Sequence, residues 1–183
     1  EPPLLTLTAT FTPVTCNGGT DGTITATPGG GFGSYSYVWT PGPLTNQTET
    51  GLPQGTYVCV VTDGNMCTAS ATTTVTEPTA IVTTTAAVDA NCNLSDGSVS
   101  ANANGGTGTI DYQWLNGGPA TFDWNNIPSG TYTVVVSDQN GCADTLTQAV
   151  QNLNGVNAVL NSSTNLTCFN DATGAIDVDA TGG

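Results

Sequence analysis

The sequence lacks every basic side chain: it has no lysine, arginine or histidine, against 14 aspartates and glutamates, and its net charge is −14. Without histidine or lysine, the chain cannot perform Ser–His, Cys–His or lysine-based nucleophilic catalysis. Nucleic acids and anionic membrane surfaces are bound through basic residues, so we expect neither as a partner. No ordinary intramolecular salt bridge can form, and only dissolved cations can offset the repulsion among the carboxylates.

Long hydrophobic runs and strong helix formers are also scarce. The sequence contains no run of about 18 apolar residues and no signal peptide, so we expect no direct membrane insertion by this stretch. For a surface protein, those segments must lie elsewhere in a longer chain. Threonine, glycine, alanine, valine and asparagine dominate, whereas glutamate, leucine and methionine are few, which favours strands over helices.

One stretch occurs twice, and the rest of the chain repeats around it. Residues 55–67 and 130–142 each contain Gly-Thr-Tyr, a run of β-branched residues, a turn with aspartate and asparagine, and a final cysteine. Side chains alternate in a strand, so Tyr57, Cys59 and Val61 point to one face. The pattern predicts a half-buried central strand that ends in a hairpin turn.

The spacing of the repeat predicts the domain boundaries. Cys16, Cys92 and Cys168 are each 76 residues apart. The predicted domains are a first repeat at 1–76, a second at 77–152, and an incomplete third at 153–183 that contains only the first strands. We expect the chain to be part of a longer array.

Each complete repeat contains about seven short runs of strand-forming residues separated by glycine, proline, asparagine and aspartate. Trp39, in the third run, faces the Tyr-x-Cys of the central strand, and we interpret both aromatics as core residues. The pattern predicts an all-β fold: tandem immunoglobulin-like β-sandwich repeats of about 76 residues. Glu77 and Pro78 form a short, stiff junction, which predicts an extended array.

Repeats of this size are close to the lower limit for a self-sufficient core, and disulfides commonly supplement such cores. We predict two disulfides of near-equal loop length, Cys16–Cys67 and Cys92–Cys142. Cys59 is then an unpaired, buried thiol, because the second repeat has Val134 at that position. Paired cysteines indicate an oxidising compartment, so we expect the chain to be extracellular.

The cysteines allow two alternatives. The first is an immunoglobulin-style bridge from Cys16 to Cys59, which is disfavoured because Cys92 has only Cys142 as a partner in its repeat. The second is zinc binding, which is disfavoured because the sequence has no Cys-x-x-Cys and no histidine.

Four motifs of the sequence are the opening Cys-x-Gly-x-x-Asp-Gly, an aromatic-x-Trp strand, Leu-Pro-x-Gly-Thr-Tyr, and the closing Val-x-Asp-x-Asn-Gly-Cys. Together they resemble the SprB repeat, a family found in very large surface adhesins of Bacteroidota. The resemblance covers both complete repeats and the opening of the third; Met66 departs from it where the second repeat has Gly141. It implies type IX secretion, display on the cell surface as long filaments, and movement by the gliding machinery.

Two functions compete on this evidence. The first is a structural stalk in a very large cell-surface adhesin filament, used for gliding motility and surface attachment and not as an enzyme. Its expected partners are neighbouring repeats, surface polysaccharide and the gliding machinery. The alternative is a carbohydrate-binding β-sandwich module, which would use Phe122 and Trp124, two aromatics without counterparts in the first repeat.

We predict no catalytic and no cofactor-binding residue. Asp63 and Asp138 recur in the hairpin turns, where aspartate commonly caps its own backbone. Glu77, at a repeat junction, is a weak candidate for a structural calcium site, although no ordered spacing of acidic ligands accompanies it. Asp144-Thr145-Leu146 resembles the O-glycosylation signal of Bacteroidota, which makes Thr145 a candidate for a glycan.

Overall fold

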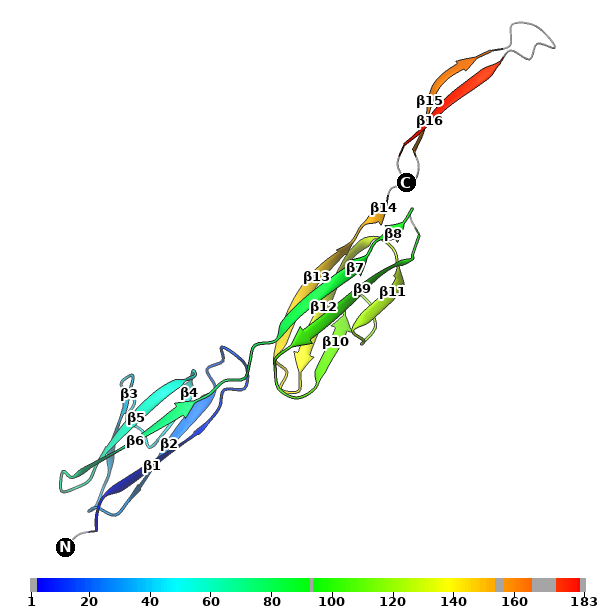
Figure 1. The fold of residues 1–183 in the computed structure, drawn as a ribbon. Helices are drawn as coiled ribbons and strands as arrows, with labels where there is room; N and C mark the ends of the chain where they lie inside the picture. Colours follow the sequence, from blue (N-terminus) through cyan, green and yellow to red (C-terminus); the bar gives the residue numbers. More distant parts are fainter. Residues whose placement is uncertain (1–2, 93, 154–156, 166–173, 182–183) are drawn as a thin grey trace. The chain divides into compact units, whose positions relative to one another are not determined.

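The computed structural model describes residues 3–92, 94–153, 157–165 and 174–181, and every regular element in these ranges is a strand (Figure 1). None of the described residues belongs to a helix long and apolar enough to span a bilayer. The all-β prediction is confirmed.

The first repeat is a sandwich of two three-stranded sheets. One sheet has the order β1-β2-β4 and the other β3-β5-β6, with antiparallel pairing throughout. The strands are β1 Thr6–Thr12, β2 Gly22–Gly29, β3 Ser36–Thr40, β4 Thr48–Leu52, β5 Gly55–Thr62 and β6 Thr68–Val75. The described part of this repeat thus has six strands, where the sequence pattern suggested about seven.

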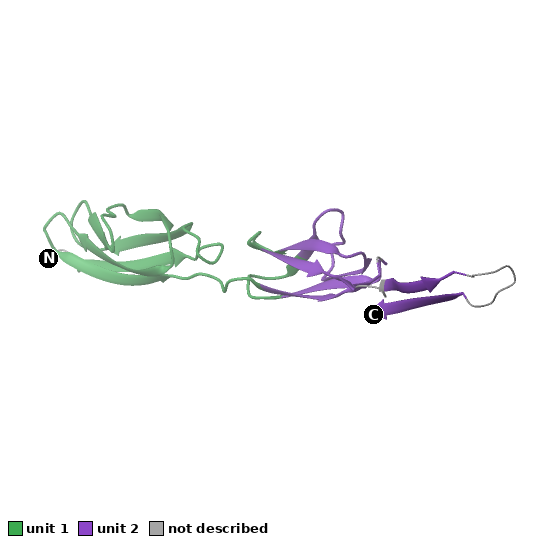
Figure 2. Cartoon of the chain, turned by 90° about the horizontal axis from the view of Figure 1, so that it is seen from above, with its two compact units in different colours: residues 1–82, 103–111, 136–144 green, residues 83–102, 112–135, 145–183 purple. Residues whose placement is uncertain are grey.

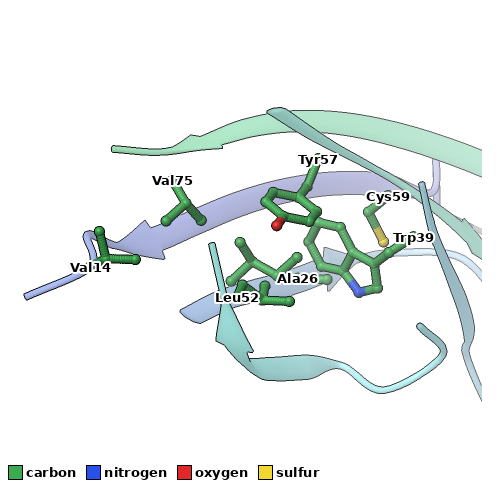
Figure 3. Packing of buried hydrophobic residues seen from close by; sticks show 8 residues of the cluster. Val14, Ala26, Trp39, Leu52, Tyr57, Cys59 and Val75 are labelled. Atoms are coloured by element: carbon green, nitrogen blue, oxygen red, sulfur yellow. The ribbon is translucent and has the colours of Figure 1, made fainter. Parts of the chain in front are cut away.

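The core of this sandwich lies between the two sheets (Figure 3). Trp39 is fully buried, and its indole Nε1 donates a hydrogen bond of 3.0 Å to the Asn46 carbonyl oxygen. On β5, Tyr57, Cys59 and Val61 are buried while the alternate valines are exposed, which confirms the predicted alternation. The interpretation of the tryptophan and tyrosine as core residues is also confirmed.

The second repeat has the same architecture. Its strands are β7 Val82–Val88, β8 Ala90–Asn91, β9 Gly97–Asn104, β10 Ile110–Trp114, β11 Asp123–Ile127, β12 Gly130–Asp138 and β13 Ala143–Val150. The sheets have the orders β11-β9-β7 and β10-β12-β13. Trp114 and Val134 are fully buried at the positions of Trp39 and Cys59 in the first repeat.

Each repeat also has a tyrosine corner, in which a tyrosine hydroxyl bonds back to the backbone just before its strand. The Tyr57 hydroxyl donates to the Pro53 carbonyl oxygen at 3.1 Å, and the Tyr132 hydroxyl donates to the Pro128 carbonyl oxygen at 2.7 Å. This feature is typical of immunoglobulin-like sandwiches. Together with the two-sheet architecture, it confirms the predicted fold class.

Three further strands lie among the described residues that follow β13. β14 Asn152–Leu153 pairs in parallel with β8, and β15 Asn157–Thr164 pairs antiparallel with β16 Ala175–Thr181. Cys168 lies outside the described residues.

By their contacts, the residues form two compact units that do not follow the repeat boundaries (Figure 2). The first unit contains Glu1–Val82 and also two loops of the second repeat, Ala103–Asp111 and Val136–Asp144. The second contains Thr83–Asn102, Tyr112–Val135 and Thr145–Gly183. The place where the first repeat passes into the second therefore lies inside the first unit.

Candidate functional site

The first part of the site is the opening loop, residues 13–21 between β1 and β2. Asp21 closes it, because its carboxylate accepts hydrogen bonds from the Thr15 hydroxyl and from the Thr15 backbone N–H, the latter at 2.9 Å. These bonds lower the pKa of Asp21 below its ordinary value, with the hydroxyl contributing most. The Gly19 N–H donates to the Cys16 carbonyl oxygen at 2.9 Å, so the backbone at Cys16 is held in a tight turn.

The second part is the closing turn of the second repeat, residues 138–142 between β12 and β13. The Asp138 carboxylate accepts backbone N–H bonds from Thr107 at 2.8 Å and from Asn140 and Cys142 at 2.9 Å each. Burial raises the pKa of Asp138, but these backbone hydrogen bonds outweigh it and hold the pKa below the ordinary carboxyl value. The predicted capping role of this aspartate is confirmed.

A disulfide joins the two parts. Cys16 is bonded to Cys142 across a sequence separation of 126 residues, with the Cα atoms 5.6 Å apart. Among the described residues, Cys67 and Cys92 are free and exposed, and Cys59 is free and buried. The predicted Cys16–Cys67 and Cys92–Cys142 pairings are therefore wrong, whereas the prediction for Cys59 is confirmed. Burial raises the pKa of the Cys59 thiol, which suits a core position.

Strand direction explains why the predicted pairings fail. Cys16 lies just before Gly22, which pairs with Leu52, so the opening loop is at the end of the sandwich where β5 begins. Cys67 follows the other end of β5, a strand of eight residues and about 25 Å at roughly 3.3 Å per residue. Disulfide Cα atoms must lie within about 7 Å of each other, so the two cysteines of one repeat cannot meet.

The sequence contained a signal for this arrangement. The first strand enters the repeat at one end, so the loop that follows it lies at the other end. The last strand leaves toward the next repeat, so the turn that precedes it lies at the entry end. Counting strand directions thus places the opening cysteine beside the following repeat and the closing cysteine beside the preceding one.

Hydrogen bonds surround the disulfide. The Glu77 carboxylate accepts from the Gly18 backbone N–H at 2.8 Å and from the Gln54 side-chain amide at 2.6 Å. The Asn17 side-chain amide donates to the Pro78 carbonyl oxygen at 3.1 Å, and that of Asn140 donates to the Thr15 carbonyl oxygen at 3.4 Å. The segment after β6 and the closing turn of the second repeat are thus both tied to one loop.

The calcium prediction at Glu77 stays a prediction. Both carboxylate oxygens of Glu77 accept hydrogen bonds from neighbouring groups. Within the described ranges, no group of three or more acidic, cysteine or histidine side chains is clustered closely enough to hold a metal ion. A comparison of thermal unfolding with calcium and with a chelator tests the prediction directly.

The two aromatics proposed for carbohydrate binding differ in their surroundings. Trp124 is half-buried and packs edge-on against Tyr132, with ring centroids 5.2 Å apart. Phe122 is 60% exposed and lines a shallow hollow of about 460 Å³ together with Tyr112 and residues of β7 and β9. Of the two, Phe122 is the more exposed side chain.

Thr145 is exposed on β13, the last strand in the order β10-β12-β13. A glycan on Thr145 stays a prediction, because it is supported only by the resemblance of Asp144-Thr145-Leu146 to a glycosylation signal.

Comparison with solved structures finds chains built from immunoglobulin domains. Sidekick-1 immunoglobulin domains 1–4 match with 14% identity and a TM-score of 0.40, over 84% of this chain and 49% of that chain. Sidekick-1 domains 1–5 match with 12% identity and a TM-score of 0.41, over 89% and 42%. The eight N-terminal domains of Down Syndrome Cell Adhesion Molecule isoform 1.30.30 match with 13% identity and a TM-score of 0.41, over 85% and 24%.

The chain thus spans half or less of the length of these three chains. The sandwich assignment rests on the strand pairing and the tyrosine corners described above. A comparison with curated proteins gives no match.

The SprB repeat model matches the chain three times, at residues 8–44, 84–119 and 160–183. These segments together make up more than half of the sequence, and each begins at the corresponding point of its repeat. The chain belongs to the SprB repeat family.

Proposed function

We propose that the chain is a stalk segment of a very large cell-surface adhesin, in which the repeats act as non-catalytic spacers. The observation that carries this proposal is the Cys16–Cys142 disulfide, because it covalently joins two consecutive repeats. Membership in the SprB repeat family supports a place in an adhesin-like surface protein. The two complete repeats bury most of the same core positions, which is expected of units selected for stability and not for separate ligands.

The disulfide suits a protein under tension. On the chain-entropy model, closing a loop of this length stabilises the folded state by about 5 kcal/mol, compared with about 4 for a bridge within one repeat. It also prevents the chain between Cys16 and Cys142 from being drawn out while the bond is intact. An oxidised cysteine pair further supports an extracellular location.

The location and the role in motility are tested on intact cells of the source organism. Fab fragments raised against the chain should label intact cells without permeabilisation, and labelled sites should travel along cells that glide. Labelling only after permeabilisation overturns the surface proposal. Labelled sites that stay fixed on gliding cells overturn the role in motility, and only the role in surface attachment then remains.

Carbohydrate binding is the second candidate, favoured by the exposed Phe122 beside Tyr112 in the second repeat. The corresponding position in the first repeat is Gln47, whose side-chain amide donates to the Ala26 carbonyl oxygen at 3.1 Å. A glycan array probed with the full chain and with Phe122→Ser separates the two functions. Retention of a polysaccharide by the parent and not by the variant establishes the binding module, whereas no retention by either favours the stalk.

A glycan on Thr145 would fit the stalk proposal. The residue is exposed on an edge strand, and the sequence has no lysine to protect such an edge from pairing with another chain. Protein purified from the source organism should be heavier than its sequence, and Thr145→Ala should remove the excess mass. A native mass equal to that of the bare sequence contradicts this proposal.

A further inference from the structure

We propose that Cys16–Cys142 is one rung of a disulfide ladder, in which the opening cysteine of each SprB repeat bonds the closing cysteine of the repeat that follows. Under this rule Cys92 takes the closing cysteine of a complete third repeat, and Cys67 takes the opening cysteine of a preceding repeat. The inference rests on the proposed function in one respect, namely that the repeats form a longer array. It specifies how neighbours in that array are joined.

The first support is that Cys67 is held in the same backbone geometry as the bonded Cys142. The Asp63 carboxylate accepts the Asn65 and Cys67 N–H groups at 2.9 Å each, the same distances as for the corresponding donors at Asp138. Its third donor is the Phe32 N–H at 3.0 Å, where Asp138 has Thr107. The Asp63 N–H in turn donates to the Cys67 carbonyl oxygen at 3.0 Å, as in the second repeat.

The second support comes from the opening loop of the second repeat. The Asp96 carboxylate accepts the Asn91 backbone N–H and the Asn91 side-chain amide, both at 2.8 Å, as Asp21 does with Thr15 in the first repeat. The loop is one residue shorter than its counterpart, and Cys92 has a positive φ of 37°. An aspartate thus closes the opening loop of the second repeat as in the first, and the loop presents an exposed cysteine immediately after β8.

The third support is that the chain leaves each complete repeat beside that repeat's opening cysteine. The Val14 N–H donates to the Thr76 carbonyl oxygen at 3.0 Å, and the Ala90 N–H donates to the Gln151 carbonyl oxygen at 3.0 Å. After the second repeat, the Cys92 N–H also donates to the Leu153 carbonyl oxygen at 3.1 Å. Whatever repeat follows β14 therefore starts next to Cys92, as the second repeat starts next to Cys16.

Strand direction removes the competing intra-repeat pairing. Because the central strand separates the opening and closing cysteines of one repeat, neither Cys67 nor Cys92 can bond the other cysteine of its own repeat. Each exposed thiol therefore fits a partner of the kind seen in the Cys16–Cys142 bond. Cys92 fits the cysteine of an Asp-x-Asn-x-Cys closing turn, and Cys67 fits the cysteine of an opening loop.

Each rung forms by thiol–disulfide exchange with a small disulfide such as oxidised glutathione. The thiolate of one cysteine attacks the small disulfide and releases one thiolate, which gives a mixed disulfide. The thiolate of the partner cysteine then displaces the second one. Two cysteine thiols lose two protons and two electrons in total, and the small disulfide is reduced to two thiols.

The test uses an extended chain in which residues 152–183 are replaced by a second copy of residues 77–152, so that Glu77 of the copy follows Gln151 as Glu77 follows Thr76. The copy carries Cys92→Ser, so that only the original Cys92 is present, and Gln139→Asn, which marks its closing peptide by mass. An Asp-specific protease suits the mapping, because cleavage before each aspartate places every cysteine of the sequence on a separate peptide. Trypsin has no site in this chain.

The ladder predicts two linked pairs under non-reducing conditions. Peptide 1–20 should be bonded to the unmarked closing peptide, and peptide 89–95 to the marked one, while Cys67 is alkylated as a free thiol. In the matched control with the original Cys92→Ser, the marked closing cysteine should gain one alkyl group.

Peptide 89–95 bonded to the unmarked closing peptide, or a marked closing cysteine that stays alkylatable in the extended chain, overturns the ladder. Either result leaves the cell-surface and glycan experiments to decide the stalk proposal on their own.

Discussion

The two closing turns have the same internal structure and different outcomes. In residues 63–67 and 138–142, an aspartate accepts three backbone N–H groups and holds a cysteine at the end of the turn. Cys142 is bonded to the preceding repeat, whereas Cys67 is exposed and free. The local sequence therefore determines how the cysteine is presented, and Cys142 is bonded because Cys16 lies within reach.

One difference in the turns is local. Met66 has a φ of 67°, and the second repeat has Gly141 with a φ of 81° at the same place. A side chain with a Cβ atom is strained in this region of backbone space, while glycine is not. Since Met66 is 81% exposed, its side chain gains little burial in return.

The largest expected effect concerns extension under force. With the disulfide intact, the 126 peptide steps between Cys16 and Cys142 cannot extend. Reduction should lengthen the fully unfolded chain by roughly 430 Å, at about 3.4 Å per residue. Single-molecule pulling with and without reductant measures this increase. Cys142→Ser should match the reduced parent without reductant, and Cys67→Ser should behave as the oxidised parent; a lengthening near 170 Å would instead indicate a bridge within one repeat.

Removing the bonded and the free cysteine should change stability unequally. Cys16→Ser should lower the free energy of unfolding by up to about 5 kcal/mol, because it releases the closed loop in the unfolded chain. Cys67→Ser should change it by less than about 0.5 kcal/mol, since that thiol is exposed and unbonded. Urea unfolding of both variants under non-reducing conditions makes the comparison. Equal losses would contradict the disulfide assignment.

Acid should weaken both turns alike. The folded-state pKa values of Asp63 and Asp138 are lowered, so their contribution to stability is present above the unfolded pKa of about 3.9 and is lost as the pH falls through the folded values. Asp63→Asn and Asp138→Asn should each destabilise the chain at neutral pH and flatten the loss of stability below pH 4. Urea midpoints between pH 2.5 and 6 record this. A variant with the full acid dependence of the parent would rule out its aspartate as a source.

The smallest expected effect concerns the residue before the cysteine in each closing turn, Met66 or Gly141. Met66→Gly relieves the left-handed backbone strain, although glycine adds freedom to the unfolded chain. We expect a net stabilisation of up to about 1 kcal/mol. Gly141→Ala, the matched change in the second repeat, should destabilise by a similar amount. Thermal unfolding of both variants gives the signs, and a loss of stability in Met66→Gly would show that the strain is not the controlling term.

Much of the fold could be predicted from residue patterns. Alternation around Cys59 identified the buried face of the central strand, and the position of Trp39 opposite that strand identified it as a core residue. These are local or short-period signals, and burial follows from them directly. The recurrent turn aspartates were likewise recognisable, because an aspartate followed by asparagine and cysteine caps its own turn.

The disulfide partners were missed because loop length was used in place of strand direction. Cys16–Cys67 and Cys92–Cys142 close loops of near-equal length, which made them look like equivalent bridges. The distance that decides the pairing is set by the central strand, which carries the two cysteines to opposite ends. The packing of Trp124 against Tyr132 was missed for a different reason: it is specific to the second repeat, since the first repeat has Glu49 at the position of Trp124.

The Cys16–Cys142 bond also gives the two ends of this stretch a second covalent connection, in addition to the peptide backbone between them. A protease that cuts any single peptide bond between these cysteines leaves the two fragments joined through sulfur. A surface protein exposed to foreign proteases would thus lose no length to one such nick. A second cut between the same two cysteines does not detach the distal part either, because the bond still connects the fragments that carry Cys16 and Cys142. Tolerance to such damage is therefore a property of the connection itself.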